Sequence, residues 1–500
     1  APDDQTGRGT RSRSPLLDGG YAVADYREIA APYGTVEQAT EFIERARALG
    51  IRTLVDLVPN HVSWEHPWFV EALAAEPGSP ARERFHFLPG RGDNGAAPPN
   101  DWQSVFGGSA WTRTTNPDGT PGEWYLHLFN ASQPDVNWAN PAVADEIDAV
   151  MRFWLERGAA GFRVDVAHSL TKEPGYPDLG ERSHRDGAMW LEGHPHWDRD
   201  DIHPIVRRWR SVLDEYPGTM MVAEAWVRAD RRPLYLRPDE YHQAFDFEFL
   251  RTDWDASEFA RVITQSFDSA RAVGSHPTWV LSNHDMVRHT TRYGLPNGTV
   301  PEAWLLDGPH DALDAEQGLR RARAAALVIL GLPGSVYLYQ GEELGLPEVW
   351  DLPTDVLDDP VWTDSKGTSK GRDGCRVPLP WSAEGPSYGF GSGSAWLPQP
   401  GAFAELAASV QDGDPASTLE LYRTALAVRR EHLAGDDTLE VISIAGDVLQ
   451  VQRGAGTQIV VNMSSEPFEM PAGTIVVASD ATQALHPDRL DPDSAVWLRT

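Results

Sequence analysis

The chain has 500 residues, and 43 Lys and Arg against 74 Asp and Glu give it a formal net charge of -31 at pH 7. This charge repels polyanions, so nucleic acid and anionic membrane surfaces are excluded as expected partners. The single cysteine, Cys375, excludes an intramolecular disulfide framework. The sequence contains neither an apolar run of membrane-spanning length nor a signal-peptide pattern at its start. We therefore expect a cytoplasmic protein, either a monomer or a homodimer.

From about residue 36 onwards, helical and strand-like patterns alternate along the chain. Residues 36–50 have helical spacing and end at Gly50, a residue typical of helix C-caps. The predicted strands lie in residues 51–61, 158–167, 219–226, 243–249, 278–283 and 335–343. The helices predicted after the first lie in residues 140–158, 203–218, 256–274, 319–334 and 417–432. Such alternation indicates parallel strands with helical crossovers, as in an α/β barrel or a doubly wound sheet.

Two parts of the chain depart from this alternation. Residues 62–139 are rich in Trp, Pro and Gly, and a connection of that length is typical of a functional loop or an inserted domain. After Ala434 the pattern changes to short β-type runs separated by Gly, Asp and Asn, which predict a small antiparallel domain. We therefore predict a catalytic barrel in residues 1–61 and 140–434, an inserted domain B in 62–139 and a C-terminal β domain in 435–500.

Three acidic residues follow apolar strands in similar settings. They are Asp165 in GFRVDVAHS, Glu224 in MMVAEAW and Asp285 in TWVLSNHD. Barrel enzymes place their sites at the carboxyl ends of such strands. A retaining glycosidase needs one carboxylate as nucleophile and one carboxylic acid as proton donor, and a further anion that grips sugar hydroxyls stabilises its oxocarbenium-like transition state. The three acids therefore indicate a carbohydrate-cleaving site.

Further polar residues accompany these acids at the predicted strand ends. Asp56 and His61 belong to the LVDLVPNH segment, Arg163 precedes Asp165, and His284 precedes Asp285. Taken singly, an Asp there is often a helix cap and a His a hydrogen-bonded structural residue. Their recurrence at successive strand ends favours one joint site.

The segments DLVPNH, GFRVDVAHS, VAEAW and LSNHD resemble the four conserved segments of the α-amylase superfamily of glycoside hydrolases, glycoside hydrolase family 13, in the same order. QPDVN at 133–137 is similar to a fifth segment of its α-glucosidase and oligo-1,6-glucosidase branch. The resemblance implies a TIM (β/α)8-type barrel, with Asp165 as nucleophile, Glu224 as general acid/base and Asp285 as transition-state stabiliser. It also implies that Arg163, His61 and His284 contact the sugar or orient the carboxylates, with Asp56 in support.

Two segments narrow the branch to exo-acting members. DGGYAVADY is similar to the segment whose Asp and Tyr, here Asp18 and Tyr21, line the first glucose subsite. GRDGCRVPLPW resembles the segment whose first Arg, here Arg372, pairs with that Asp. The expected activity is release of terminal α-linked glucose from short oligosaccharides. Val166 resembles the residue of α-1,6-acting members at that position, although one residue leaves the linkage open.

The resemblance also leaves alternatives open. Members of the family carry a strand, a helix and a second strand before the DGGY segment. We count six predicted strands, whereas a (β/α)8 barrel has eight. We therefore expect a barrel that is incomplete at its N-terminus. The family's calcium-binding loop lies in that part, so we predict no metal, and we predict no cofactor either. The remaining alternatives are an α-glucosyl transferase or isomerase acting on sucrose, maltose or trehalose, and an inactive fragment of such an enzyme.

Overall fold

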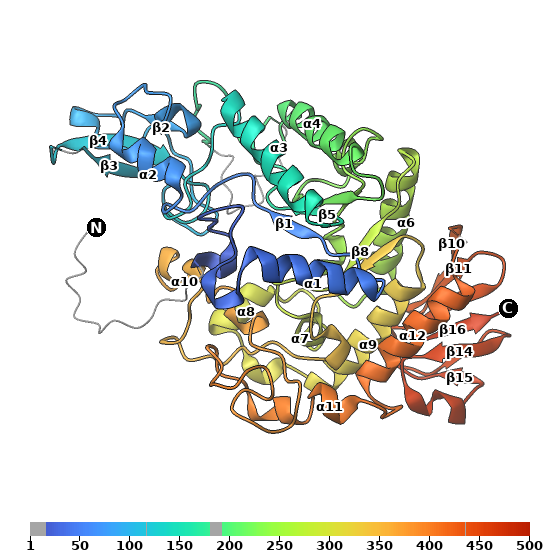
Figure 1. The fold of residues 1–500 in the computed structure, drawn as a ribbon. Helices are drawn as coiled ribbons and strands as arrows, with labels where there is room; N and C mark the ends of the chain where they lie inside the picture. Colours follow the sequence, from blue (N-terminus) through green and yellow to red (C-terminus); the bar gives the residue numbers. More distant parts are fainter. Residues whose placement is uncertain (1–16, 117, 181–192, 436) are drawn as a thin grey trace. The chain divides into compact units, whose positions relative to one another are not determined.

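The computed structural model describes residues 17–116, 118–180, 193–435 and 437–500 (Figure 1). The chain divides into two compact units. Unit 1 comprises Ala1–Ala244 with Asp358–Gly367, and unit 2 comprises Phe245–Leu357 with Thr368–Thr500. Among the described residues, no helix has both the length and the apolar character needed to cross a membrane. The cytoplasmic location stays a prediction.

Unit 1 is built on a parallel sheet of four strands in the order β1-β5-β6-β7. These strands are β1 (Val55–Leu57), β5 (Gly161–Val164), β6 (Met220–Ala223) and β7 (Gln243–Ala244). A helix precedes each of them: α1 (Val36–Ala48), α3 (Pro141–Glu156), α4 (His203–Asp214) and α5 (Arg232–Tyr235). The starts of two of these helices are capped, since Thr35 and Gln38 form a capping box at α1 and the Asn140 side chain caps α3. The predicted alternation of helices and parallel strands is therefore confirmed in this unit.

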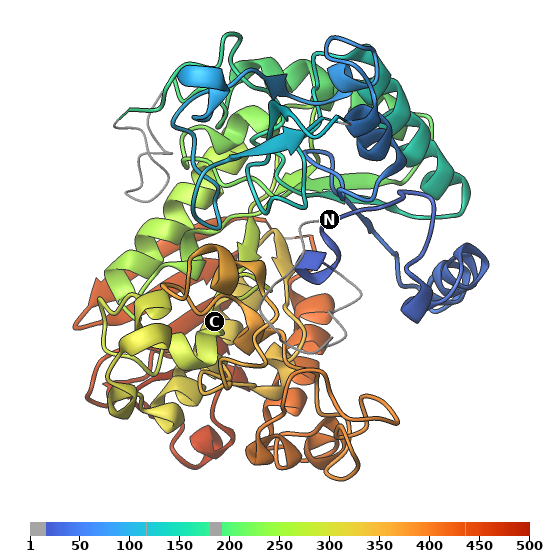
Figure 2. The same cartoon turned by 90° about the vertical axis from the view of Figure 1, so that its left-hand side faces the viewer.

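The stretch between β1 and α3 folds into a small sheet of its own, which can be followed in Figure 1 and from the side in Figure 2. It holds α2 (Pro67–Ala74) and an antiparallel sheet of order β2-β4-β3, made of β2 (Phe87–Leu88), β3 (Trp111–Thr115) and β4 (Pro121–Leu126). Buried tryptophans, Trp102 and Trp111, form its core with Leu126 and Leu128. Packing thus accounts for these loop tryptophans, and this part of the chain has the content expected of an inserted domain.

Unit 2 contains two further parallel strands, β8 (Thr278–Val280) and β9 (Ser335–Tyr337), paired with each other. Its helices are α6 (Ala256–Ala272), α7 (His289–Arg292), α8 (Pro301–Asp307), α9 (Ala315–Gly331), α11 (Ala408–Gln411) and α12 (Thr418–His432). The short helix α10 (Pro360–Asp364) belongs to unit 1. Within the described ranges the parallel strands therefore number six, at the six places that the sequence predicts.

The C-terminal residues form an antiparallel sheet of order β10-β11-β12-β16-β14, as the sequence predicts. Its strands are β10 (Leu439–Ala445), β11 (Val448–Arg453), β12 (Thr457–Asn462), β14 (Thr474–Ala478) and β16 (Ser494–Arg499), and β13 (Phe468–Glu469) pairs separately with β15 (Arg489–Leu490). The sheet packs on α9, where the indole N–H of Trp497 donates to the Leu327 carbonyl at 2.9 Å. The sheet belongs to unit 2 together with α9, so the predicted domain boundaries differ from the boundaries of the two compact units. The predicted domains stay a prediction.

Candidate active site

Two of the three predicted catalytic acids lie at the carboxyl ends of neighbouring strands in unit 1. Asp165 directly follows β5 and Glu224 directly follows β6, and these strands pair in parallel. Their backbone N–H groups extend the ladder, since Asp165 donates to the Leu57 carbonyl at 2.9 Å and Glu224 to the Val164 carbonyl at 2.8 Å. The two residues are 7% and 6% exposed. The structure therefore brings both carboxylates to one edge of the sheet.

Arg163 links the predicted nucleophile to two other predicted site residues. Its guanidinium lies 2.6 Å from Asp165 Oδ1 and 2.9 Å from Asp56 Oδ1, and it donates to the Tyr21 hydroxyl at 3.1 Å. That hydroxyl in turn donates to Asp56 Oδ2 at 3.1 Å. Burial lowers the pKa of Arg163, but the charges of Asp165, Tyr21 and Asp56 outweigh it and raise the pKa well above its ordinary value. Arg163 therefore stays charged and orients both carboxylates.

Val166 connects the ends of strands β5 and β6 through its backbone. Its φ is 47°, a left-handed conformation that a β-branched residue rarely adopts and that costs about 1–3 kcal/mol. The bend turns the Val166 N–H onto Glu224 Oε2 at 2.8 Å, and the next N–H, of Ala167, reaches the Glu224 carbonyl at 3.0 Å. The strain thus coincides with a bond that orients the predicted acid/base.

His61 is held as a neutral imidazole in a buried network. Asn60 Nδ2 is a donor 3.2 Å from His61 Nδ1, so Nδ1 accepts and Nε2–H donates to the Tyr21 carbonyl at 3.0 Å. Burial lowers the pKa of His61. Asn60 also donates to Asp135 Oδ2 at 3.1 Å, and Lys172 Nζ lies 2.9 Å from the same oxygen. The network fixes the ring beside Tyr21.

The third predicted acid, Asp285, follows β8 in unit 2. Arg372 and Arg376 each donate to its Oδ1 at 3.0 Å, and His284 Nε2 lies 3.5 Å from its Oδ2. Arg376 also donates to the His284 carbonyl at 2.8 Å. The predicted bridge from Arg372 to Asp18 concerns a residue of the other unit and stays a prediction.

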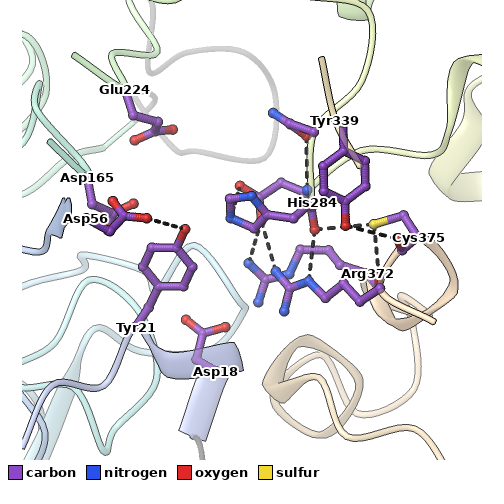
Figure 3. A network of polar contacts seen from close by, with 12 residues as sticks. Asp18, Tyr21, Asp56, Asp165, Glu224, His284, Tyr339, Arg372 and Cys375 are labelled. Carbon is purple, nitrogen blue, oxygen red and sulfur yellow. Dashed lines mark hydrogen bonds and ion pairs between the residues drawn. The ribbon is translucent and has the colours of Figure 1, made fainter. Parts of the chain in front are cut away.

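Cys375 is a structural residue next to the loop that carries His284 and Asp285. It is buried, its thiol lies 3.3 Å from the His284 carbonyl, and its own carbonyl accepts the Tyr339 hydroxyl at 3.0 Å (Figure 3). Burial raises the pKa of the thiol, which keeps it protonated. The side chain therefore contributes packing and hydrogen bonds here.

No role was predicted from the sequence for several residues that, within one unit or the other, contact predicted site residues or the partners of those residues. They are Asn60, Phe129, Gln133, Asp135, Lys172 and Arg376. Gln133 and Asp135 belong to the QPDVN segment, and Arg376 belongs to GRDGCRVPLPW. The resemblance of these segments to family motifs is the sequence feature that could have identified the three residues. Lys172 had none, because its carboxylate partner is far away in the sequence.

The described residues contain no group of three or more His, Cys, Asp or Glu side chains that could hold a metal ion. The clustered oxygens of Asp135 and Asn60 are matched by the ammonium of Lys172, which also donates to Asn60 Oδ1 at 3.0 Å. The Lys172 ammonium is therefore the cation that these oxygens bind. The expectation of no metal stays a prediction.

Comparison with known proteins shows which family this chain resembles. The family model of the alpha amylase catalytic domain matches residues 12–436. A probable alpha-glucosidase of Rhizobium meliloti (strain 1021) is 34% identical over 473 residues, which are 91% of this chain and 80% of that protein. An oligo-1,6-glucosidase of Parageobacillus thermoglucosidasius is 30% identical over 455 residues, which are 84% of this chain and 75% of that protein.

The likeness extends to the fold. The solved structure of an alpha-glucosyl transfer enzyme, XgtA, has a TM-score of 0.82 and 30% identity, with 97% of this chain and 90% of that one covered. Together with the parallel strands and the C-terminal antiparallel sheet, these matches confirm the fold class and the resemblance predicted from the sequence segments.

Proposed function

Because this chain belongs to the α-amylase family of glycoside hydrolases, we propose that it is a retaining, exo-acting α-glucosidase that releases terminal α-linked glucose from short oligosaccharides. The observation that carries the proposal is the parallel pairing of strands β5 and β6, which Asp165 and Glu224 directly follow. One of these carboxylates is in an ion pair with Arg163 and the other accepts a backbone N–H. Their different surroundings suit the different tasks of a nucleophile and an acid/base.

In the proposed reaction, Asp165 attacks the anomeric carbon and forms a covalent glucosyl ester, while Glu224 protonates the departing glycosidic oxygen. Arg163 holds the nucleophile ionised and oriented before the attack. Water then attacks the ester while Glu224, now a carboxylate, takes a proton from that water, which restores the Asp165 carboxylate and the protonated Glu224 and releases glucose with retained configuration. The Val166 N–H holds Glu224 in orientation through both steps.

Asp285 is the proposed transition-state stabiliser, with His284 beside it. Two arginines bind its Oδ1, so the carboxylate is held in a single orientation as an anion. Such an anion favours the positive charge that develops on the sugar ring. Asp18, Tyr21, His61, Asp56 and Arg372 are the proposed contacts or supports of the terminal glucose, and they account for exo action.

An α-glucosyl transferase is the second candidate, because XgtA, an alpha-glucosyl transfer enzyme, shares the fold at 30% identity. Hydrolases and transferases of this type use the same covalent intermediate and differ in whether water or a sugar attacks it. Products formed at high substrate concentration separate the two. Free glucose alone supports the hydrolase, whereas new oligosaccharides support the transferase.

The test of the proposal is turnover by the purified chain of p-nitrophenyl α-glucoside, maltose and isomaltose, compared with the Asp165→Asn variant. We expect glucose as the released sugar, with the α-anomer formed first, and loss of activity in the variant. Wild-type turnover that gives the β-anomer first would contradict the retaining mechanism. A folded wild-type chain that turns over none of the three would contradict the proposal.

A further inference from the structure

We propose that Gln133 is a positioning residue for Asp18, holding this carboxylate ready to bind the terminal glucose. The inference rests on the proposed function, in which Asp18 contacts that glucose. Gln133 is 0% exposed and stands in the QPDVN segment between β4 and α3. Its Nε2 donates to Asp18 Oδ2 at 3.0 Å.

The carboxamide of Gln133 can be placed in only one orientation. Its Oε1 accepts the backbone N–H of Asn130 at 3.0 Å, and a carbonyl oxygen is the only atom of the amide group that can accept. The NH2 group must therefore point the other way, towards Asp18. Because the backbone of its own turn fixes this direction, Gln133 presents a donor to Asp18 before any substrate arrives.

His61 lies against the same amide nitrogen. Its Nε2–H donates to the Tyr21 carbonyl, and Gln133 Nε2 lies 3.3 Å from that same nitrogen. Two donors that face each other form no hydrogen bond, so this contact adds packing and leaves Asp18 as the acceptor of the Gln133 N–H. One buried amide thus lies against two proposed glucose-binding residues.

The segment that carries Asp18 is held at both of its ends. Asp18 adopts a left-handed conformation with φ 51°, its carbonyl accepts the Tyr21 N–H at 3.1 Å, and the Tyr21 carbonyl accepts His61. Gln133 contacts the Asp18 side chain itself (Figure 3 shows Asp18 and Tyr21). A carboxylate fixed before binding spares the substrate the entropy cost of ordering it, which improves affinity. The expected signature of its loss is a raised KM with a smaller change in kcat.

The discriminating variant is Gln133→Glu, which keeps the shape and replaces the donor by a second carboxylate. At neutral pH two carboxylates about 3 Å apart repel, so we expect KM for p-nitrophenyl α-glucoside to rise about 10- to 100-fold. At lower pH one proton is shared between them, a donor to Asp18 is restored, and KM should fall back towards the wild-type value. Asp18 and His61 face position 133 directly, while Asp364 is reached through Asn130, and Asp135 and Lys172 are reached through His61 and Asn60. All of these groups are also present in the wild type, so the difference between the two pH profiles isolates position 133.

A matched control exists in unit 2. Gln317 Nε2 donates to Asp493 Oδ2 at 3.0 Å, the same pair of groups at the same distance. Gln317→Glu should alter thermal stability while leaving KM and its pH profile as in the wild type. Gln133→Met is a second, neutral variant of similar length, and it should raise KM without a pH-dependent recovery.

Asp18→Asn separates this inference from the proposed function. If it raises KM while Gln133→Glu and Gln133→Met stay within twofold of wild type at every pH, the positioning role is wrong and the glucose subsite stands. If Asp18→Asn leaves KM unchanged, the proposed glucose subsite is itself wrong and the inference fails with it. A KM that rises equally at all pH values in Gln133→Glu would show a merely structural role.

Discussion

The buried ion pair between Lys172 and Asp135 makes the sharpest prediction about stability. Its nitrogen and oxygen are 2.9 Å apart, and the side chains are 1% and 0% exposed. Lys172→Met removes the ammonium and leaves a carboxylate in the interior. The other groups around it, Asn60 and the Leu128 N–H at 2.9 Å from Oδ1, are neutral. An uncompensated buried charge is among the most destabilising changes a single substitution can make.

The expected size follows from the geometry. Two unit charges 2.9 Å apart attract by about 6 kcal/mol at an effective dielectric constant of about 20. Part of this attraction offsets desolvation, and removing one partner of such a pair costs about 3–5 kcal/mol. At about 2–4 °C per kcal/mol for a unit of this size, Lys172→Met should lower the midpoint of thermal unfolding by roughly 10 °C.

Thermal unfolding followed by tryptophan fluorescence measures this loss. Lys370→Met is the control, because Lys370 donates to a neutral carbonyl, that of Trp350, and its loss should cost about 1 kcal/mol or less. The double variant Lys172→Met/Asp135→Asn removes the orphaned charge and should unfold at a higher temperature than Lys172→Met alone. A Lys172→Met midpoint equal to that of Lys370→Met, or a double variant less stable than the single one, would refute the reasoning.

Three further changes test other parts of the structure. Burial raises the pKa of Glu342 from 4.5 to about 8. The stability that protonated Glu342 contributes is therefore complete below about pH 4.5 and is lost as the pH rises through 8. In a pH series of unfolding midpoints, Glu342→Gln should flatten this decline, and wild-type and variant curves that run parallel would contradict the prediction. Gly161 has φ 133°, and a Cβ there would lie 1.6 Å from the Met220 carbonyl oxygen. Gly161→Ala should therefore lower the free energy of unfolding, measured in urea, by about 3 kcal/mol or more. The control Gly413→Ala, whose Cβ meets open space, should cost about 1 kcal/mol, and equal losses in the two variants would be inconsistent with the clash. Arg163→Met should lower kcat/KM by about 10²–10³-fold in steady-state assays, and a loss below tenfold would rule out its role in orienting Asp165.

The strand-end acids could be predicted because their signal is local. An apolar run followed by Asp or Glu marks the end of a buried strand, and β5 and β6 end directly before Asp165 and Glu224, while β8 ends at Val280, a few residues before Asp285. The strands themselves are shorter than their patterns, as in β1, which covers Val55–Leu57 of the predicted 51–61. The polar residues after the apolar core leave the ladder and become site residues instead.

Contacts that join distant segments could not be predicted in this way. Nothing near Lys172 in the sequence indicates that Asp135 neutralises it, and nothing near Gln133 indicates that it donates to Asp18. The left-handed backbone of Val166 is equally hidden, because local propensity argues against it and the surrounding structure imposes it. Arg376 stood in a quoted motif, yet its bond to Asp285 depends on two loops folding together. Tertiary packing decides all four.

The central claim is that Asp165 forms a covalent bond to glucose. The direct measurement is mass spectrometry of peptides from the protein after incubation with a fluorinated glucosyl fluoride that forms the ester faster than water cleaves it. The account predicts one glucosyl adduct, on the peptide that contains Asp165, and none in Asp165→Asn. An adduct on Glu224, or wild-type turnover of the reagent through an inverted product without any adduct, would contradict it.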